Sequence, residues 1–380
     1  MKRKIRMGMV GGGPGAFIGN VHRMASRLDG KIELTCGAFS NSLAKCKSMA
    51  EGLFLPEEKC YASYEEMFDK ERKLPLGERM DFVAITTPNF MHFKIAMAAL
   101  EKGFHVVCEK PMTFSLDEAI ALRKKVQESG LLFVLMHNYS AYPMILQMEK
   151  MLADGKIGRI RKVIAEYDLG WLAAPNAGKQ ATWRITPEKS GIAACVSDIG
   201  THAAHLIEFT TGLKIKELAA DLSTFVEGRV LDDDATILLR FDNGARGLIE
   251  VSEVACGEEN RFNFRVYGSE GCLEWNQQEP ENLVYKTNDA AMKVLRRGWA
   301  ELDSSVDKYT RLPAGHPEGF LEAFANIYSD FADAVVAKLE NRVYESSFPT
   351  VEDGVREMNF IKKVVESSNK NAAWMALEKI

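Results

Sequence analysis

The sequence predicts an α/β protein of two domains, with a doubly wound parallel sheet in residues 1–138 and a large, mostly antiparallel, open-faced sheet in residues 139–380. Three observations predict this division. In the first part, short apolar strand patterns alternate with helix patterns, which is typical of a parallel sheet covered on both faces. In the second part, longer stretches alternate apolar and polar residues, as in antiparallel strands with one buried face. The chain, at 380 residues, is also too long for one ordinary core.

The composition is typical of a soluble globular protein and argues against several classes of function. Hydrophobic residues make up 46% of the chain and charged residues 27%. A net charge of −5 argues against a nucleic-acid partner, and the absence of a long apolar run argues against a membrane span. The seven cysteines are scattered without a CxxC pair, so we expect a reducing cytoplasm rather than disulfides or a zinc site.

The first part of the chain is expected to alternate strands and helices. The serines Ser63 and Ser115 stand three residues before Glu66 and Glu118, the capping-box spacing that begins a helix. Further helices are expected at about 20–28 and 90–102. The expected strands are 5–10, 32–38, 82–85, 104–108 and 131–136.

A glycine-rich turn follows the first expected strand. Gly11 and Gly13 fit the start of the G-x-G-x-x-G pattern, whose glycines let backbone N–H groups approach a pyrophosphate at a helix N-terminus. Two readings of the third position are open: Ala16 occupies it, or the turn is longer and Gly19 does. Either way, the position of the turn predicts a dinucleotide site of the Rossmann type.

Ser40 and Asn41 follow the second expected strand, at the place where a site for NAD usually has an acidic residue for the ribose diol. No carboxylate and no adjacent arginine stand there. The cofactor prediction is therefore NAD with NADP not excluded. Ser40 and Asn41 have an alternative explanation as the cap of the next helix.

The buried strand before Pro111 ends in Glu109 and Lys110. Proline has no N–H and restricts the residue before it to extended geometry, so the strand stops there. A lysine at the carboxyl end of a strand in such a sheet points into the crevice where these folds bind ligands. The alternative is a surface lysine after a strand.

The second part is expected to contain about six longer strands, including a hairpin around Asp242, Asn243 and Gly244. Helices are expected at about 142–153, 317–339 and 351–367. The acids Asp232 and Asp233 precede a strand together with Asp234, and we interpret the three as a solvated turn rather than a cation site.

One expected helix in this part carries candidate chemical groups. Asp198, His202 and His205 share a face at helical spacing. Three interpretations are open: a buried polar face, a zinc site, or an acid/base histidine oriented by a carboxylate. No distant third ligand stands out, so no metal is predicted.

These motifs together resemble those of the Gfo/Idh/MocA oxidoreductase family, over nearly the whole chain. The combination of a Glu-Lys-Pro run with an Asp-x-Gly-x-His helix at this separation is far more specific than any glycine loop. The residues that carry the resemblance are Thr87, Pro88, Asn89 and His92, then Glu109, Lys110 and Pro111, then Trp183, Arg184 and Gly191, and finally Asp198, Gly200 and His202.

The resemblance implies an N-terminal Rossmann domain, a dinucleotide cofactor and a sugar, polyol or glycoside substrate. It further implies that Lys110 contacts the reacting hydroxyl, that His202 is the acid/base and that Asp198 holds the histidine or a substrate hydroxyl. The cofactor would be lined by Thr87, Pro88, Asn89, His92 and Glu109. We also expect Tyr139, Trp183 and Arg184 to shape the sugar site, as members of a wider set with Tyr142, Trp171, Lys179 and Gln180.

The expected reaction is oxidation of an alcohol, with a hydride moved to the nicotinamide and a proton to a base. Histidine is the side chain whose unperturbed pKa lies near neutrality, and a lysine ammonium stabilises developing alkoxide charge. The alternative is a redox-neutral enzyme whose tightly bound NAD oxidises a sugar carbon transiently. A homodimer or homotetramer formed through the open sheet face is expected in either case.

Overall fold

The computed structural model describes residues 3–175, 179–378 and 380, and the chain divides into two compact units. The first unit comprises Met1–Asn138 and Phe324–Val355, and the second comprises Tyr139–Ala323 and Arg356–Ile380. The segment 324–355 thus returns to the first unit, so neither unit is one continuous stretch of sequence. The assignment of dinucleotide binding to 1–138, and of substrate binding and oligomerisation to 139–380, stays a prediction.

The first unit contains a five-stranded sheet with the order β2-β1-β3-β4-β5. Every strand pair in it is parallel. All residues of β3 and β4 are buried, as expected for strands covered on both faces. The doubly wound prediction is therefore confirmed. The strands are β1 (Ile5–Gly11), β2 (Ile32–Ala38), β3 (Phe82–Thr86), β4 (His105–Cys108) and β5 (Phe133–Leu135).

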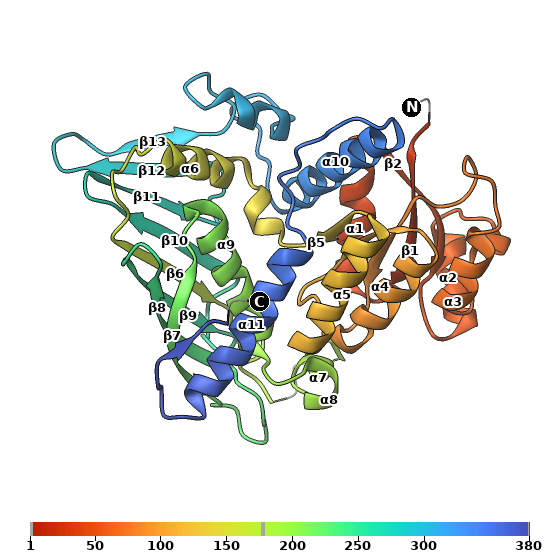
Figure 1. Cartoon of the computed structure of the whole chain (residues 1–380), viewed down its shortest axis with the longest axis horizontal. Coiled ribbons are helices and arrows are strands. Elements are labelled where there is room, and N and C mark those ends of the chain that lie inside the picture. Colours follow the sequence, from red (N-terminus) through yellow and green to blue (C-terminus); the bar gives the residue numbers. More distant parts are fainter. Residues whose placement is uncertain (1–2, 176–178, 379) are drawn as a thin grey trace. The chain divides into compact units, whose positions relative to one another are not determined.

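The strand order places helices on both faces of this sheet (Figure 1). The chain steps from β1 outward to β2 and then back across β1 to β3. Because crossovers between parallel strands are right-handed, this reversal puts the first helix and the later ones on opposite faces. On the first face α10 joins α1, since Tyr328 and Phe331 pack on Phe82. The helices are α1 (Phe17–Leu28), α2 (Leu43–Gly52), α3 (Tyr64–Glu71), α4 (His92–Glu101), α5 (Leu116–Ser129) and α10 (Phe320–Leu339).

Both predicted capping boxes are present. The hydroxyl of Ser63 accepts from the backbone N–H of Glu66 at 3.2 Å, and Ser115 accepts from Glu118 at 3.3 Å. Each glutamate reaches back to a backbone N–H just before its cap, that of Ala62 or Phe114. These exchanges satisfy amide groups that α3 and α5 would otherwise leave open.

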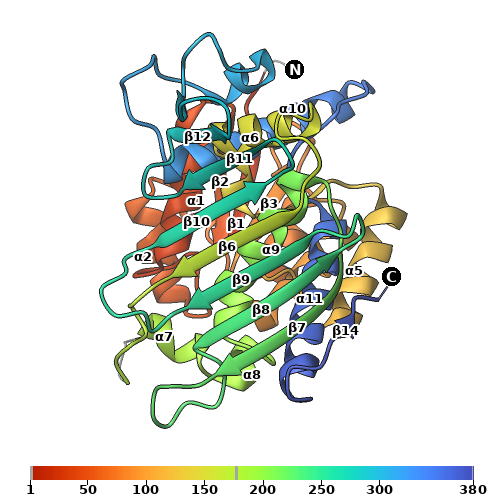
Figure 2. The same ribbon diagram turned by 90° about the vertical axis from the view of Figure 1, so that its left-hand side faces the viewer.

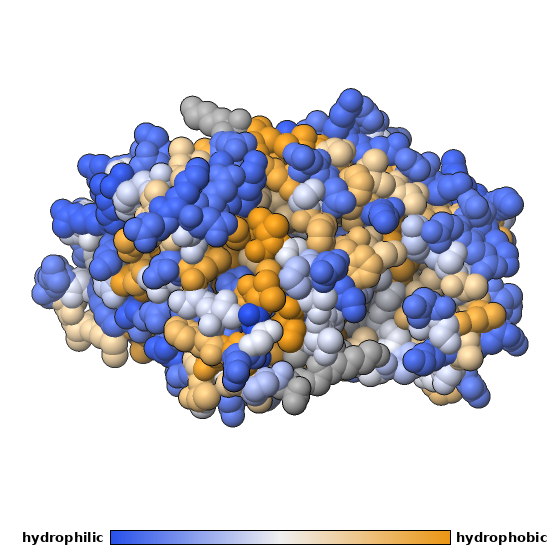
Figure 3. All heavy atoms as spheres, turned by 90° about the horizontal axis from the view of Figure 1, so that it is seen from below, coloured by the Kyte–Doolittle hydropathy of each residue, from blue (hydrophilic) through white to orange (hydrophobic). Residues whose placement is uncertain are grey.

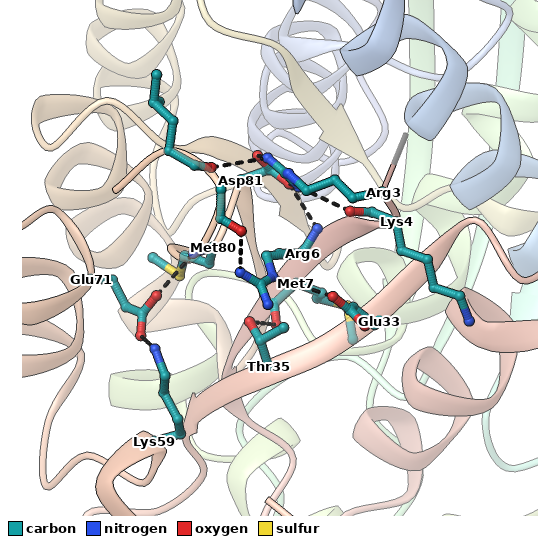
Figure 4. Close-up of polar contacts among 12 residues, drawn as sticks. Arg3, Lys4, Arg6, Met7, Glu33, Thr35, Lys59, Glu71, Met80 and Asp81 are labelled. Carbon is teal, nitrogen blue, oxygen red and sulfur yellow. Dashed lines mark hydrogen bonds and ion pairs between the residues drawn. The ribbon is translucent and has the colours of Figure 1, made fainter. Parts of the chain in front are cut away.

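Ion pairs hold the amino ends of the strands in register (Figure 4). Asp81, directly before β3, accepts from both terminal nitrogens of Arg3 at 2.6 and 2.7 Å. It also accepts from the backbone N–H of Arg6 in β1 at 2.8 Å, while the Arg6 side chain reaches Glu33 in β2 at 3.2 Å. Three neighbouring strands are thereby tied together at one edge of the sheet.

A second acid at this edge is fully buried. Glu71 accepts from Lys59 Nζ and from the Tyr61 hydroxyl, both at 2.8 Å, and from the backbone N–H of Met80 at 2.9 Å. Figure 4 shows Lys59 and Met80 converging on it. Burial, with the adjacent Glu71, raises the pKa of Tyr61. The phenol therefore stays a donor, and both oxygens of the carboxylate have partners.

The second unit contains a nine-stranded sheet with the order β13-β12-β11-β10-β6-β9-β8-β7-β14. Among the described strands of this second sheet, only β6 and β9 pair in parallel. The prediction of a mostly antiparallel sheet is therefore confirmed. The strands are β6 (Lys162–Asp168), β7 (Ile215–Ser223), β8 (Asp234–Phe241), β9 (Arg246–Ser252), β10 (Arg261–Tyr267), β11 (Gly271–Asn276), β12 (Asn282–Thr287), β13 (Lys293–Arg296) and β14 (Met375–Ala376).

The expected count of about six strands was too low. The six expected strands correspond to β6–β11, and the missed ones lie at the sheet's ends. β12 is half-buried along nearly all of its length and β13 is largely exposed, so neither shows the alternation of a strand with one buried face. β14 has two residues and forms only by pairing with β7.

One face of the large sheet carries helices and the other does not. Helices α6, α9 and α11 lie along one face (Figure 1), and Figure 2 looks onto the opposite face, which no described helix of this unit covers. The end of α11 is tied to β7, since Ser367 accepts from the backbone N–H of Ala220 at 2.8 Å. The helices are α6 (Pro143–Ala153), α7 (Lys179–Arg184), α8 (Pro187–Ser190), the π-helical turn η4 (Val196–Gly200), α9 (Thr201–Thr211) and α11 (Val351–Ser368).

Some large apolar side chains are exposed, among them Phe54 and Val343 at 95% and 94%. Figure 3 shows hydrophobic residues in small groups among hydrophilic ones on the face it presents. Within the described residues, no helix is both long and apolar enough to cross a membrane.

Candidate active site

The glycine loop after β1 lies very close to neighbouring main chain, at positions where a side chain would not fit. Gly11, Gly12 and Gly15 have φ of +89°, +68° and +77°, which side-chain-bearing residues rarely adopt. A Cβ at Gly11 would lie 2.7 Å from the carbonyl oxygen of Thr86, and a Cβ at Gly13 would lie 2.6 Å from that of Phe39. The loop therefore passes directly against the carboxyl ends of β3 and β2.

The third glycine of the pattern is Gly19, which resolves the alternative left open by the sequence. A Cβ on Gly19 would lie 2.3 Å from the Cα of Gly12. Ala16 instead has extended geometry and is the residue before α1. The turn is thus the longer variant, and α1 begins at Phe17, earlier than expected.

Ser40 and Asn41 follow β2 beside this loop. A Cβ on Gly13 would lie 3.6 Å from the Cβ of Ser40. Neither residue is the cap of α2, because Ser42 occupies that position and donates its N–H to the Ser40 hydroxyl at 3.2 Å. The cap explanation for Ser40 and Asn41 was therefore wrong.

The segment after β3 brings further polar groups to this edge. Thr87 lies against the loop, because its nitrogen would be 3.0 Å from a Cβ on Gly11. Its hydroxyl is buried and has no hydrogen-bond partner within the described part of the chain. Pro88 precedes a short turn in which Asn89 is 4% exposed. Close-approach glycines and an unsatisfied hydroxyl are features that a bound dinucleotide fits.

His92 links two of these segments. Its ring nitrogens each lie 2.8 Å from a main-chain carbonyl oxygen, Nδ1 from that of Pro111 and Nε2 from that of Thr87. The ring is 1% exposed, and burial lowers the pKa of His92, against the opposing effect of the two carbonyl contacts. Both ring nitrogens of His92 therefore face main-chain carbonyl groups of the protein itself.

The end of β4 holds the Glu-Lys-Pro run. Glu109 is 7% exposed, and its Oε1 contacts His22 Nε2 at 2.7 Å. The other ring nitrogen of His22 lies 2.6 Å from the hydroxyl of Tyr328 on α10. The backbone N–H of Lys110 donates to Glu109 Oε2 at 3.2 Å, and the Lys110–Pro111 peptide is cis.

In the second unit, Asp198 lies in the π-helical turn η4 and not in a regular helix. Its Oδ2 accepts from Arg184 Nε at 2.8 Å. The Arg184 guanidinium in turn lies over the rings of Trp183 and Trp171, at 4.4 and 5.3 Å. Arg184 and Asp198 are therefore in direct contact, with two aromatic faces beside the guanidinium. The side chains of Lys179 and Gln180 lie outside the described residues.

The start of this turn is fixed by Asp232. Its carboxylate accepts from the backbone N–H groups of Ala194 and Val196 at 2.6 and 2.8 Å. Burial raises the pKa of Asp232 to about 6 despite these bonds. Asp233 is 1% exposed and accepts from the backbone N–H of Phe225 at 2.8 Å. Interpreting these acids as a solvated turn was wrong, because both carboxylates are buried and accept from main-chain N–H groups.

Glu253 is a second acid near Asp198 and is fully buried. Burial raises the pKa of Glu253 well above its ordinary value, and the neighbouring charge of Asp198 raises it further, against the opposing charge of Arg184. Burial disfavours the charged form of a carboxyl group. Asp198 thus lies between the Arg184 guanidinium and a buried carboxyl group with a raised pKa.

His202, on the first turn of α9, is 7% exposed and packs on aromatic rings. The Tyr139 ring meets it edge to face, with centroids 4.8 Å apart. The Tyr139 hydroxyl lies 2.6 Å from that of Tyr167, which donates to Asn260 at 2.8 Å. Tyr139, expected at the sugar site, therefore has its hydroxyl in an internal cluster and its ring against His202. No metal-ligand cluster occurs among the described residues.

Several residues at these positions were not predicted from the sequence. His22 and Arg23 are two of these; they share one face of α1, and Arg23 donates to the carbonyl oxygen of Gly12 at 2.8 Å. Polar residues at this spacing within an otherwise buried helix face were the available signal. Tyr328, Asp232 and Glu253 gave no such signal, because their partners are remote in sequence.

The sequence matches two family descriptions over most of its length. Residues 5–137 match the oxidoreductase family with an NAD-binding Rossmann fold, and residues 145–274 match the GFO/IDH/MocA C-terminal domain. Among curated proteins, the oxidoreductase YfiI of Bacillus subtilis is 34% identical, covering 99% of this chain and 97% of its own.

Solved structures agree with this match. An oxidoreductase of Sinorhizobium meliloti is 42% identical with a TM-score of 0.89, covering 98% of this chain and 100% of its own. An inositol dehydrogenase homologue of Azotobacter vinelandii complexed with NAD⁺ is 33% identical with a TM-score of 0.95, covering 99% of this chain and 98% of its own. The same homologue has also been solved with NADH and myo-inositol, at 33% identity and a TM-score of 0.92 over the same shares of both chains. The chain therefore belongs to the Gfo/Idh/MocA family of NAD-binding oxidoreductases.

Proposed function

We propose that this protein is an NAD-dependent dehydrogenase that acts on a hydroxyl of an inositol-like polyol, a sugar or a glycoside. Membership of the family supports the reaction type. The relative solved with NADH and myo-inositol supports the substrate class. The polar environment of Asp198 supports an uncharged polyol over a sugar acid, because Arg184 is already paired with Asp198 and burial disfavours the charged form of Glu253.

The observation that most supports the proposal is that several side chains hold the turn before His202 in place. Asp232 holds its start through two backbone N–H groups, Arg184 holds Asp198 within it, and the Tyr139 ring packs against His202. π-helical turns are rare and occur frequently at functional sites. Side chains held in this way keep the orientation that proton transfer needs.

Each polar group has a proposed task. His202 takes the proton of the substrate hydroxyl, or returns it in the reverse reaction. Lys110 presents its ammonium to the same oxygen and stabilises the charge that develops there. Asp198 binds a neighbouring hydroxyl or orients His202.

The cofactor side is assigned to the loop and strand ends of the first unit. Bound NAD supplies the hydride acceptor. The proposed contacts are made by Gly11, Gly13, Ser40, Asn41, Thr87, Pro88, Asn89, Glu109 and Lys110, while His92 fixes the main chain of Thr87 and Pro111. The uncovered face of the large sheet is the proposed surface for a homodimer or homotetramer.

The test is the appearance of reduced nicotinamide, followed by its near-ultraviolet absorbance, with NAD and separately with NADP. The panel contains inositols, aldoses, glycosides and sugar acids. We expect a signal with NAD and an uncharged polyol or sugar. A signal with sugar acids alone would contradict the substrate class. Silence across the panel, with NAD(H) released on denaturing the purified protein, would replace the proposal with the redox-neutral alternative.

A further inference from the structure

We infer that Asn260 is a positioning residue for His202, and that it acts through the hydroxyl groups of Tyr139 and Tyr167. The inference rests on the acid/base role proposed for His202. Asn260 lies directly before β10 and belongs to none of the motifs that the sequence singled out. The inference therefore adds the start of β10 to the parts of the chain that set the reaction rate.

Asn260, Tyr139 and Tyr167 form a closed network of hydrogen bonds within the second unit. The Tyr167 hydroxyl donates to Oδ1 of Asn260 at 2.8 Å, and Nδ2 of Asn260 donates to the Tyr139 hydroxyl at 3.3 Å. The two hydroxyl oxygens lie 2.6 Å apart. Because the Tyr167 proton is directed at Asn260, the Tyr139 hydroxyl donates to Tyr167. Each member of this Asn260 network thereby both donates and accepts.

Both phenols of the Asn260 network are buried and keep their protons. Tyr139 is 3% exposed and Tyr167 is 4% exposed, so water hardly competes for these hydrogen bonds. Burial raises the pKa of each hydroxyl group above its usual value. The proton of Tyr139 is thus used inside the protein, and the hydroxyl has no second proton to donate to a substrate. This favours a positioning role for Tyr139 over direct hydrogen bonding to a sugar.

Aromatic packing connects the Asn260 network with His202. The Tyr139 ring meets the imidazole edge to face, with centroids 4.8 Å apart and ring planes at 90°. The Tyr167 ring lies 6.4 Å from the imidazole. It also stacks at 4.7 Å on Phe262, its direct partner across β6 and β10. The strand pair therefore fixes Tyr167, and the contact between the hydroxyl groups ties Tyr139 to it.

The network explains how a change at Asn260 reaches His202. Without the amide, Tyr167 loses its acceptor and the Tyr139 hydroxyl loses its donor. Buried hydroxyl groups that lose a partner move toward another one, because leaving them unsatisfied costs free energy. The Tyr139 ring then shifts with its hydroxyl. An imidazole whose packing partner moves spends less time in the orientation that proton transfer needs.

The experiment is a double-mutant cycle with Asn260→Leu and Tyr139→Phe, assayed with NAD and the polyol or sugar that gives the strongest signal. Each single variant should lower kcat about fivefold to tenfold, with KM for the substrate and Kd for NADH changed less than about threefold. The double variant should match the more impaired single variant, because both changes break the same network. Additive losses would overturn the inference. A rise of KM in Tyr139→Phe alone would also overturn it, since Tyr139 would then contact the substrate directly.

A second readout does not depend on the substrate. Diethyl pyrocarbonate modifies imidazole nitrogens, and mass spectrometry maps the modified histidines. The labelling rate of His202 should rise several fold in Asn260→Leu, because the imidazole is held less firmly. His105 in the first unit is as little exposed as His202, at 7%, and serves as an internal reference whose rate should not change. An unchanged rate at His202 would overturn the inference.

The matched control is Thr210→Val, which removes a buried hydroxyl from α9, the same helix as His202. The Thr210 hydroxyl donates to the carbonyl oxygen of Leu206 at 2.7 Å and lies outside the Asn260 network. This variant should leave kcat and the labelling of His202 unchanged. If His202→Ala keeps normal turnover, the proposed function fails. If His202→Ala is inactive while Asn260→Leu and Tyr139→Phe are normal, only the positioning inference fails.

Discussion

The parallel sheet has an amino edge, where its strands begin, and a carboxyl edge, where they end. Buried polar groups at the two edges differ in how they are hydrogen-bonded. At the amino edge, Asp81 and Glu71 have every oxygen paired with a donor from the protein. At the carboxyl edge, glycines remove side chains from the loop and the buried Thr87 hydroxyl has no partner in the described residues. Both edges belong to the same strands and share one core.

This difference in hydrogen bonding distinguishes residues that stabilise the fold from residues that can bind a ligand. A buried acid with several donors stabilises the folded chain, whereas an unsatisfied buried hydroxyl costs stability until something binds it. Ligands of open α/β sheets bind at the carboxyl edge. Substitutions at the amino edge should therefore change stability alone, and those at the carboxyl edge should change catalysis or cofactor binding.

The largest effect is expected at Lys110. Lys110→Met should lower kcat by at least about 10²-fold, because the developing alkoxide loses its cation, with little change in the Kd for NAD. The matched control is Lys59→Met at the amino edge, which removes the partner of Glu71 and should lower the thermal midpoint while leaving kcat unchanged. Steady-state kinetics with thermal unfolding measures both. Near-normal turnover in Lys110→Met would remove the lysine from the reaction.

Glu71→Ala should give the largest loss of stability. The change leaves Tyr61 and the backbone N–H of Met80 without their acceptor inside the protein, at a cost of about 3 kcal/mol in the free energy of unfolding. Denaturant unfolding measures it, and kcat of the folded fraction should be normal. The matched control is Glu128→Ala, in an exposed pair with Lys124, for which a change below about 1 kcal/mol is expected. Equal losses in the two variants would mean that burial of Glu71 does not matter.

Gly19→Ala tests the longer glycine loop. The new Cβ would lie 2.3 Å from the Cα of Gly12, so the loop must shift. We expect the Kd for NAD to rise about tenfold, measured by quenching of protein fluorescence. Gly52→Ala is the control, because nothing lies within 4 Å of a Cβ there. An unchanged Kd in Gly19→Ala would restore Ala16 as the third position of the pattern.

The smallest effect concerns Glu253, whose surroundings are the reverse of those of Glu71. Because the pKa of Glu253 is raised in the folded state, its contribution to stability is complete below the ordinary glutamate pKa and is lost as pH rises through the folded value. Glu253→Gln keeps a neutral side chain at every pH. As pH rises from mildly acidic to mildly basic, the thermal midpoint of the variant should therefore increase relative to that of the wild type. A difference independent of pH would mean that Glu253 is not protonated in the folded protein.

The sequence was informative where local pattern sets the structure. Buried strands and both capping boxes were found in this way, because strand periodicity and helix caps depend on neighbouring residues. The Glu-Lys-Pro and Asp-x-Gly-x-His positions were singled out by resemblance to the family, and their roles stay a prediction. The exact length of the glycine loop required the structure, since only the approach of Gly19 to Gly12 identifies the third glycine.

What the sequence did not show depends on contacts between distant residues. The edge strands β12–β14 form by pairing and not by their own pattern. Asp232 looks like part of a solvated turn until the amides of Ala194 and Val196 are placed beside it. His22 and Tyr328 are 306 residues apart, a separation across which no spacing rule applies.

The return of residues 324–355 to the first unit has a consequence for synthesis on the ribosome. Phe331 packs on Phe82 with ring centroids 4.9 Å apart, and Tyr328 completes the contact with His22. A nascent chain that ends at residue 138 therefore holds all five parallel strands but leaves one apolar face of the sheet without α10. Chaperone engagement should persist until α10 emerges. An excised nucleotide-binding fragment should be soluble only when this helix is supplied, fused to it or added as a separate peptide.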